Sequence, residues 1–332
     1  MYLNCHSYYS LRYGTMSVEQ LVQKAKAAGA DTIALTDINN STAIPEFAGE
    51  CARNSIKPVA GIEFRNGNEL EYIGIARNNS GMRELNEFLS KQNFEKTEVP
   101  FPAPRFSDAY VIYSESKLPG RKLLENERTG IKAREINRLL TVPSADRSRM
   151  VILQPVTFAG DDDIFIHRSL RAVDNNILLS HLKPSQCAGE IEFFLPQEQI
   201  RRSFESYPEI VHNTVNLLND CNLSLDFENH KNKKLFSASR YDDKLLLEKL
   251  AWDGMIYRYG RNNSEARKRI SHELEIIDNL GFSAYFLITW DIVRYSMARG
   301  FYHVGRGSGA NSIVAYCLKI TNVDPIDLNL YF

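Results

Sequence analysis

The sequence has few cysteines, and none of them falls in a metal-binding or disulfide pattern. Five cysteines are scattered over 332 residues without a Cys-x-x-Cys pair. An odd, dispersed set of thiols argues against both a disulfide framework and a zinc site. We therefore expect the thiols to be reduced and mostly buried. They belong to Cys5, Cys51, Cys187, Cys221 and Cys317.

Long apolar runs, low-complexity segments and a signal-type leader are also missing. No run approaches the roughly 18 apolar residues of a membrane span. The first residues, Met1 to His6, are typical of a β-strand rather than of a basic and then apolar leader. We therefore expect no membrane association and a cytoplasmic location. With 43% hydrophobic residues, the chain should be globular and long enough for two domains.

A strong net charge is missing too, although the overall balance hides a basic segment. The whole chain carries a formal charge of −1. Residues 231–272 contain 11 Lys and Arg against five Asp and Glu, an excess of six, so the remainder carries about −7. This segment fits a surface that follows a DNA backbone, or alternatively a solvated helix face. The candidate DNA-backbone residues are Arg267, Lys268 and Arg269.

Strands and helices alternate through the first half of the chain. Ser17 to Gln20 form a capping box that predicts a helix start, and Gly29 predicts its end. This alternation predicts βαβ units and a mostly parallel sheet or barrel. The expected strands are residues 2–5, 32–37, 58–64, 72–76, 109–113 and 150–153, and further helices are expected at 44–54, 82–92, 125–140 and from 164.

From about residue 184 the pattern becomes nearly all helical. Helices are expected at residues 243–259, 264–280 and 285–299. In the middle one, the period of the apolar residues predicts a buried stripe. The aromatic residues of the last one are expected in the core rather than as platforms for bases. The stripe is Ile270, Leu274, Ile277 and Leu280, and the aromatic residues are Tyr285, Phe286 and Trp290.

Three glycines within residues 305–309 mark a tight turn before an apolar run that starts at Ile313. Glycine lets a ligand approach the backbone closely. Free N–H groups at a helix start attract anions, and arginine and serine side chains add donors. The turn therefore predicts a phosphate-binding site, with a packing turn as the alternative interpretation. Its residues are Gly305, Arg306, Gly307, Ser308 and Gly309.

The turn and its surroundings resemble the start of the palm in the C family of DNA polymerases, the bacterial replicative DNA polymerase III alpha subunits. The similarity runs from about residue 270 to residue 332 and includes the segments 280–291 and 319–332. It implies that the turn holds the triphosphate of the incoming nucleotide. One departure is visible, because His303 and Val304 stand where the family usually has Gly-Pro.

The first half resembles the PHP domain at the amino end of the same polymerases. The resemblance rests on polar residues at the carboxyl ends of expected strands, where α/β folds place their chemistry: His6, Asp37 and Glu63. It implies an α/β fold with a PHP-type, barrel-like domain over residues 1–185. A mostly helical connector and the amino-terminal part of the palm would then occupy residues 186–332.

The PHP resemblance implies a cluster of metal ligands, but several ligand positions are changed. Asn4 and Ile38 stand where the family has histidines, and the late histidine motif aligns with Gln154 to Thr157. A multinuclear site needs more convergent ligands than the three that remain. We therefore expect no metal in this domain and a hydrogen-bonded remnant at these positions. A single weakly held cation is the alternative.

The resemblance also implies that the catalytic residues lie outside this sequence, because the carboxylates that hold Mg²⁺ in the family follow the position of Phe332. We therefore expect an amino-terminal portion of a DNA-directed DNA polymerase that extends primed DNA with deoxynucleoside triphosphates. This portion should be inactive alone, with its PHP domain a non-catalytic scaffold. The implied partners of the full-length protein are a sliding clamp, a clamp loader and a proofreading exonuclease. The alternatives are a standalone replisome-binding scaffold and a metal-dependent phosphoesterase.

Overall fold

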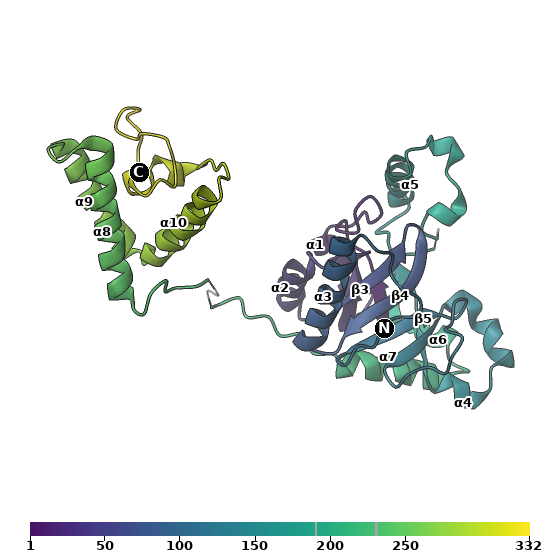
Figure 1. Cartoon of the computed structure of the whole chain (residues 1–332). Coiled ribbons are helices and arrows are strands. Elements are labelled where there is room, and N and C mark those ends of the chain that lie inside the picture. Colours follow the sequence, from purple (N-terminus) through teal and green to yellow (C-terminus); the bar gives the residue numbers. More distant parts are fainter. Residues whose placement is uncertain (190, 230–231) are drawn as a thin grey trace. The chain divides into compact units, whose positions relative to one another are not determined.

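The structure, a computed structural model, describes residues 1–189, 191–229 and 232–332. Its contacts divide the chain into two units, Met1–Asp226 and Phe227–Phe332 (Figure 1). This boundary lies beyond residue 185, where the sequence pattern placed it, because helices α6 (Gln197–Ser203) and α7 (Pro208–Asp220) belong to the first unit. Lys231, the first residue of the basic segment, lies outside the described residues.

Within the described part of the first unit, eight strands form one sheet in the order β7-β6-β5-β4-β3-β2-β1-β8. Neighbouring strands are parallel except that β4 runs antiparallel to β3 and to β5. The expected mostly parallel sheet is therefore confirmed. The strands are β1 (Tyr2–Cys5), β2 (Thr32–Leu35), β3 (Lys57–Asn66), β4 (Glu69–Ala76), β5 (Ala109–Ser114), β6 (Glu127–Ile131), β7 (Met150–Ile152) and β8 (Pro155–Val156).

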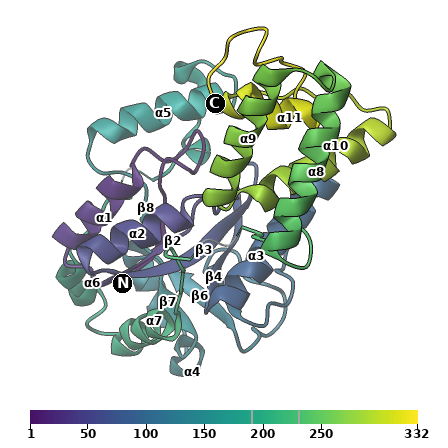
Figure 2. The same cartoon turned by 90° about the vertical axis from the view of Figure 1, so that its left-hand side faces the viewer.

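Both faces of the sheet carry a core, because successive side chains of a strand point to opposite faces. Tyr2 and Ile33 pack with the helices of one face, whereas Leu3 and Ala34 pack with Leu217 of α7 on the other. Figure 2 shows α1 and α2 on one side of the strands and α7 on the other. The helices of the first face are α1 (Val18–Ala27), α2 (Ile44–Asn54) and α3 (Asn79–Glu95).

The helix expected over residues 125–140 is wrong. Glu127–Ile131 form β6, which pairs in parallel with both β5 and β7, and a 3₁₀ helix, η1 (Ala133–Thr141), follows. Thr129 and Ile131 are β-branched and suit a pleated sheet better than a helix. The helix expected from residue 164 begins at Asp162. The unit's remaining elements are α4 (Ser144–Arg147), α5 (Asp162–Asp174), η2 (Leu179–His181) and η3 (Pro184–Gln186).

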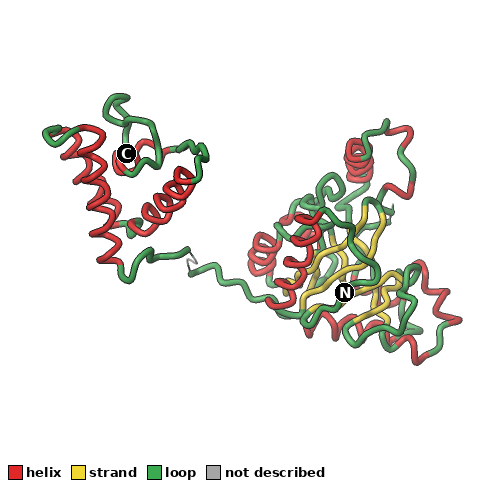
Figure 3. The backbone as a smooth tube through the Cα atoms, viewed as in Figure 1, coloured by secondary structure: helices red, strands yellow, loops and turns green. Residues whose placement is uncertain are grey.

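The described part of the second unit consists of helices and loops without a strand (Figure 3). Gly254 of the first helix allows the last one to pack against it, because a Cβ at this position would lie 2.2 Å from the carbonyl oxygen of Cys317. No single helix among the described residues is long and apolar enough to cross a membrane. The elements are α8 (Arg240–Tyr259), α9 (Ser264–Asn279), α10 (Ser283–Ala298), η4 (Ser308–Asn311) and α11 (Ile313–Cys317).

The buried stripe of α9 is confirmed for three of its four expected residues. Ile270, Leu274 and Ile277 are buried in a core shared with α8 and α11. Leu280 is 65% exposed, because it lies one residue beyond the end of the helix. Tyr285, expected in the core, is also 65% exposed.

Candidate functional site

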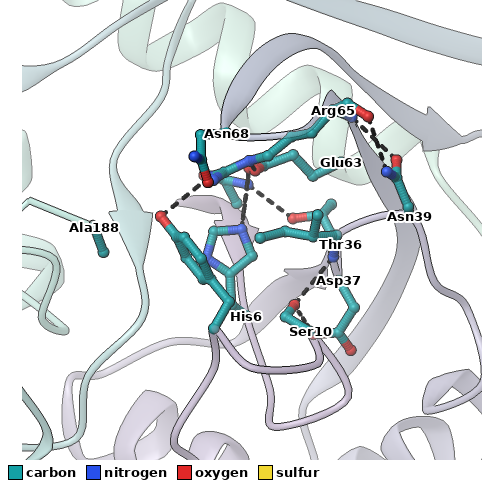
Figure 4. A network of polar contacts seen from close by, with 12 residues as sticks. His6, Ser10, Thr36, Asp37, Asn39, Glu63, Arg65, Asn68 and Ala188 are labelled. Atoms are coloured by element: carbon teal, nitrogen blue, oxygen red, sulfur yellow. Dashed lines mark hydrogen bonds and ion pairs between the residues drawn. The ribbon is translucent and has the colours of Figure 1, made fainter. Parts of the chain in front are cut away.

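We call His6, Asp37 and Glu63, the three ligand-type residues that remain, the remnant residues. The strand ends of the first unit bring two of them into direct contact. His6 Nε2 lies 3.0 Å from Glu63 Oε2. Figure 4 shows the His6 ring pointing toward Glu63. His6 Nδ1 lies 3.0 Å from Thr157 Oγ1, and Asn4 Nδ2 donates to Glu63 Oε2 at 2.7 Å. All four side chains are buried. Asn4 and Thr157, which the PHP resemblance aligns with ligand positions, thus hydrogen-bond to two of the three remnant residues.

Asp37, the third remnant residue, is held by a different set of partners. Its Oδ1 accepts hydrogen bonds from the Ser7 N–H at 2.7 Å and from Ser10 Oγ at 2.6 Å. Its Oδ2 accepts a hydrogen bond from Ser7 Oγ at 2.7 Å. Burial raises the pKa of Asp37, and the hydrogen bonds from Ser10 and Ser7 partly offset that rise. The loop after β1 therefore occupies both oxygens of this carboxyl group.

An arginine that the sequence interpretation did not include supplies a positive charge beside this cluster. Arg65 follows Glu63 by two residues on β3, and its Nε donates to Glu63 Oε1. Arg65 Nη2 donates to the Tyr13 hydroxyl at 3.2 Å, and the guanidinium carbon lies 4.5 Å from the centre of the Tyr13 ring. Burial raises the pKa of Glu63, but the charges of Arg65 and His6 outweigh burial and hold this pKa well below its usual range.

The arrangement fits a metal ion poorly. Glu63 bonds to Arg65, both ring nitrogens of His6 have partners, and Asp37 bonds to serines. In the ranges that the structure describes, no group of three or more His, Cys, Asp and Glu side chains could hold a metal. Because a guanidinium stands where a divalent ion would need free carboxylate oxygens, we derive no metal chemistry from this site. Its expected lack of metal stays a prediction.

In the second unit, the glycine turn is followed by a helix start that already carries a carboxylate. Glu273 of α9 is fully buried, and its Oε2 accepts hydrogen bonds from Ser312 Oγ at 2.7 Å and from the Val314 N–H at 3.3 Å. Ser312 Oγ in turn accepts a hydrogen bond from the Ala315 N–H. Backbone donors that the sequence pattern assigned to an external anion are therefore used inside the protein.

The turn itself stays accessible. Arg306, Gly307 and Ser308 are exposed, and Arg306 makes no ion pair or hydrogen bond with any described residue. Gly307 has a φ of +77°, which favours glycine. Gly305 and Arg306 also border a pocket of about 170 Å³. His303, a departure from the family pattern, lies 3.0 Å from the Lys319 carbonyl oxygen through its Nε2.

The three candidate DNA-backbone residues have different surroundings. Arg269 donates to Glu273 at 3.0 Å and to the carbonyl oxygen of Asn311 at 3.1 Å, so it holds the segment that follows the turn. Arg267 donates to the Arg261 carbonyl oxygen but is exposed, and Lys268 is exposed as well. A contact of these residues with DNA stays a prediction.

Comparison with known families finds one matching family model in each unit. The PHP domain family model matches residues 3–133, so the first unit contains a PHP domain. A second model, described as the bacterial DNA polymerase III alpha NTPase domain, matches residues 245–332. The chain thus joins a PHP domain to sequence of the DNA polymerase III alpha NTPase domain.

Similar proteins of known name cover the whole chain. An error-prone DNA polymerase of Symbiobacterium thermophilum is 26% identical over 381 residues, which comprise 100% of this chain and 35% of that protein. DNA polymerase III subunits alpha of Halalkalibacterium halodurans and Escherichia coli K12 are 29% and 26% identical, over 100% of this chain and 33% of each. The chain therefore spans about a third of the length of these curated relatives.

Proposed function

We propose that this chain is the amino-terminal region of a replicative DNA polymerase alpha subunit. The full-length protein would extend primed DNA with deoxynucleoside triphosphates and Mg²⁺. One observation supports this proposal: the two domain families occur in one chain whose whole length aligns with DNA polymerase III alpha subunits. No Asp-x-Asp motif follows the glycine turn in this sequence. The region alone is therefore expected to bind substrate without catalysing its transfer.

In this proposal the two units have separate tasks. Arg306 and Ser308 donate hydrogen bonds to the triphosphate of the incoming nucleotide, and the glycines leave room for the phosphates to approach the backbone. The PHP domain is a non-catalytic scaffold, since its remnant cluster is internally bonded. The partners of the full-length protein would be primed DNA, a sliding clamp, a clamp loader and a proofreading exonuclease, as the family resemblance implies.

Replacing Arg306 with alanine should weaken the binding of a deoxynucleoside triphosphate roughly ten- to a hundredfold, because a charged hydrogen bond to phosphate is lost. Ser308→Ala should weaken it less, since a neutral hydroxyl contributes less. Calorimetric titration of the 332-residue chain measures both effects. Arg299→Ala, which removes an exposed arginine outside the turn, is the matched control. Equal affinity of wild type and Arg306→Ala would contradict a nucleotide site at this turn.

The scaffold assignment predicts that the purified protein carries no stoichiometric manganese, zinc or iron. The reason is that Arg65 and Asn4 occupy the hydrogen-bonding positions of Glu63 that a metal would use. Inductively coupled plasma mass spectrometry measures the metal content, and a phosphomonoester assay measures hydrolysis. One equivalent of metal, together with hydrolysis that Asp37→Ala removes, would instead favour a metal-dependent phosphoesterase.

A further inference from the structure

A basic pocket of about 510 Å³ opens beside the remnant cluster of the PHP domain. Its walls come from segments far apart in the sequence, among them β3, the start of η1, α5 and the residues on both sides of η3. This volume is typical of small-molecule sites. The charged residues that line it are Arg65, Lys132, Arg134, Arg168, Lys183 and Glu192.

The positive charges of this pocket exceed the negative ones. Arg65 is balanced by Glu63 behind it. The other four cationic side chains form no ion pair with any residue in the described ranges, and the single lining carboxylate is that of Glu192. That carboxylate already accepts hydrogen bonds from Thr157 Oγ1 at 2.6 Å and from the Gly189 N–H at 2.9 Å. The described lining therefore carries a net charge of about +3 from these four cations and one carboxylate.

His167, which also lines the pocket, is hydrogen-bonded at both ring nitrogens and contributes no further charge. The Ala188 N–H donates to His167 Nε2 at 2.9 Å, so Nδ1 carries the ring proton and donates to the Tyr13 carbonyl oxygen at 2.7 Å. Burial lowers the pKa of His167, which keeps the ring neutral at neutral pH. The Tyr13 ring also packs against Arg65 and thereby fixes the guanidinium at the inner end of the pocket.

We propose that this pocket binds a small phosphate-bearing anion without a metal ion and without hydrolysing it. A phosphate dianion would accept hydrogen bonds from arginine and lysine side chains that converge on one concavity and lack carboxylate partners. The unpaired cations that line the pocket come from three separate segments: the start of η1, α5 and the residue before η3. The proposal does not depend on the nucleotide turn, which belongs to the other unit.

The test titrates inorganic phosphate into the 332-residue chain in chelator-treated buffer, with Arg306→Ala as the background so that the glycine turn does not contribute. Saturable binding is expected. In that background, Arg168→Ala with Lys183→Ala should weaken it roughly tenfold or more, because two charge-assisted donors are lost. Both side chains are exposed, so the fold should be unaffected. The matched control, Lys26→Ala with Lys91→Ala, removes two exposed lysines elsewhere on this unit and should leave binding unchanged.

Competition with a deoxynucleoside monophosphate and with the corresponding nucleoside tests whether the pocket binds free phosphate or the phosphate of a nucleotide. Competition by the monophosphate but not by the nucleoside is expected if the phosphoryl group is the recognised part. Tighter binding of the monophosphate than of phosphate would assign the pocket to a nucleotide, and equal binding would assign it to free phosphate. Absence of saturable phosphate binding, or an equal loss of affinity in the control variant, would overturn the proposal.

Discussion

Replacing Arg65 with methionine should lower the free energy of unfolding of the PHP domain by about 3–5 kcal/mol at neutral pH. The Glu63 side chain is 1% exposed, and Arg65 is the permanently charged group that bonds to it. Methionine fills similar space but leaves the carboxylate buried without that cation. The loss of one partner of a buried pair costs more than the pair contributes, because the remaining charge has no water to solvate it.

The size of this loss should depend on pH in a defined direction. Burial raises the pKa of Glu63, but Arg65 and His6 outweigh burial and hold it below its usual range. A carboxyl group with a lowered folded-state pKa stabilises the fold above its unfolded pKa, and this contribution is lost as the pH falls through the folded pKa. Without Arg65 the pKa of Glu63 should rise. The difference between variant and wild type should therefore shrink as the pH falls below the raised folded-state pKa of Glu63 in the variant.

Hydrogen exchange of the β1 to β3 amides is the suitable measurement for this variant. Trp252 and Trp290, the two tryptophans of the chain, belong to the second unit, so their fluorescence does not report on the PHP domain. The double variant Arg65→Met with Glu63→Leu removes both charges and should recover most of the protection. Equal protection of wild type and Arg65→Met between pH 3 and 7 would show that Glu63 does not depend on this arginine.

Local sequence patterns predicted the elements that carry the site. The capping box at Ser17 and the helix over Ile44–Asn54 are confirmed, since caps and apolar periods act within a few residues of the chain. The helix expected over residues 125–140 was wrong for Glu127–Ile131, because pairing with β5 and β7 decides the structure of this segment. That pairing depends on strands elsewhere in the chain, which a local pattern does not contain.

The partners of the remnant residues could be predicted only in part. A hydrogen-bonded remnant was expected, with His6 and a carboxylate satisfying each other, and the structure identifies that carboxylate as Glu63. Arg65 was missed although a signal existed: it lies two residues from Glu63 on one strand and therefore on the same face. Glu273 was missed as well, four residues after Arg269 on one helix face. Spacing brings such pairs together, but only the fold shows that they are buried.

Replacing Glu273 with leucine should destabilise the second unit by about 3–5 kcal/mol. This carboxylate is fully buried and accepts hydrogen bonds from Arg269 at 3.0 Å and from Ser312 at 2.7 Å. Leucine would leave the guanidinium of Arg269 and the donors at the start of α11 facing an apolar side chain. Glu273→Gln, which keeps the size and one acceptor, should cost less, because hydrogen bonds to Ser312 and Val314 can persist.

Tryptophan fluorescence during urea unfolding measures this loss, because Trp252 and Trp290 both lie at the core of the second unit. Glu275→Leu changes an exposed glutamate on the same helix and should shift stability by no more than about 0.5 kcal/mol. Deoxynucleoside triphosphate affinity, measured without denaturant, provides a second readout. Glu273→Gln removes the ion-pair partner of Arg269, which also donates to the Asn311 carbonyl oxygen next to the turn. This variant should therefore weaken nucleotide binding even where the unit stays folded. Equal stability of Glu273→Leu and Glu275→Leu would mean that the turn is placed by apolar packing alone.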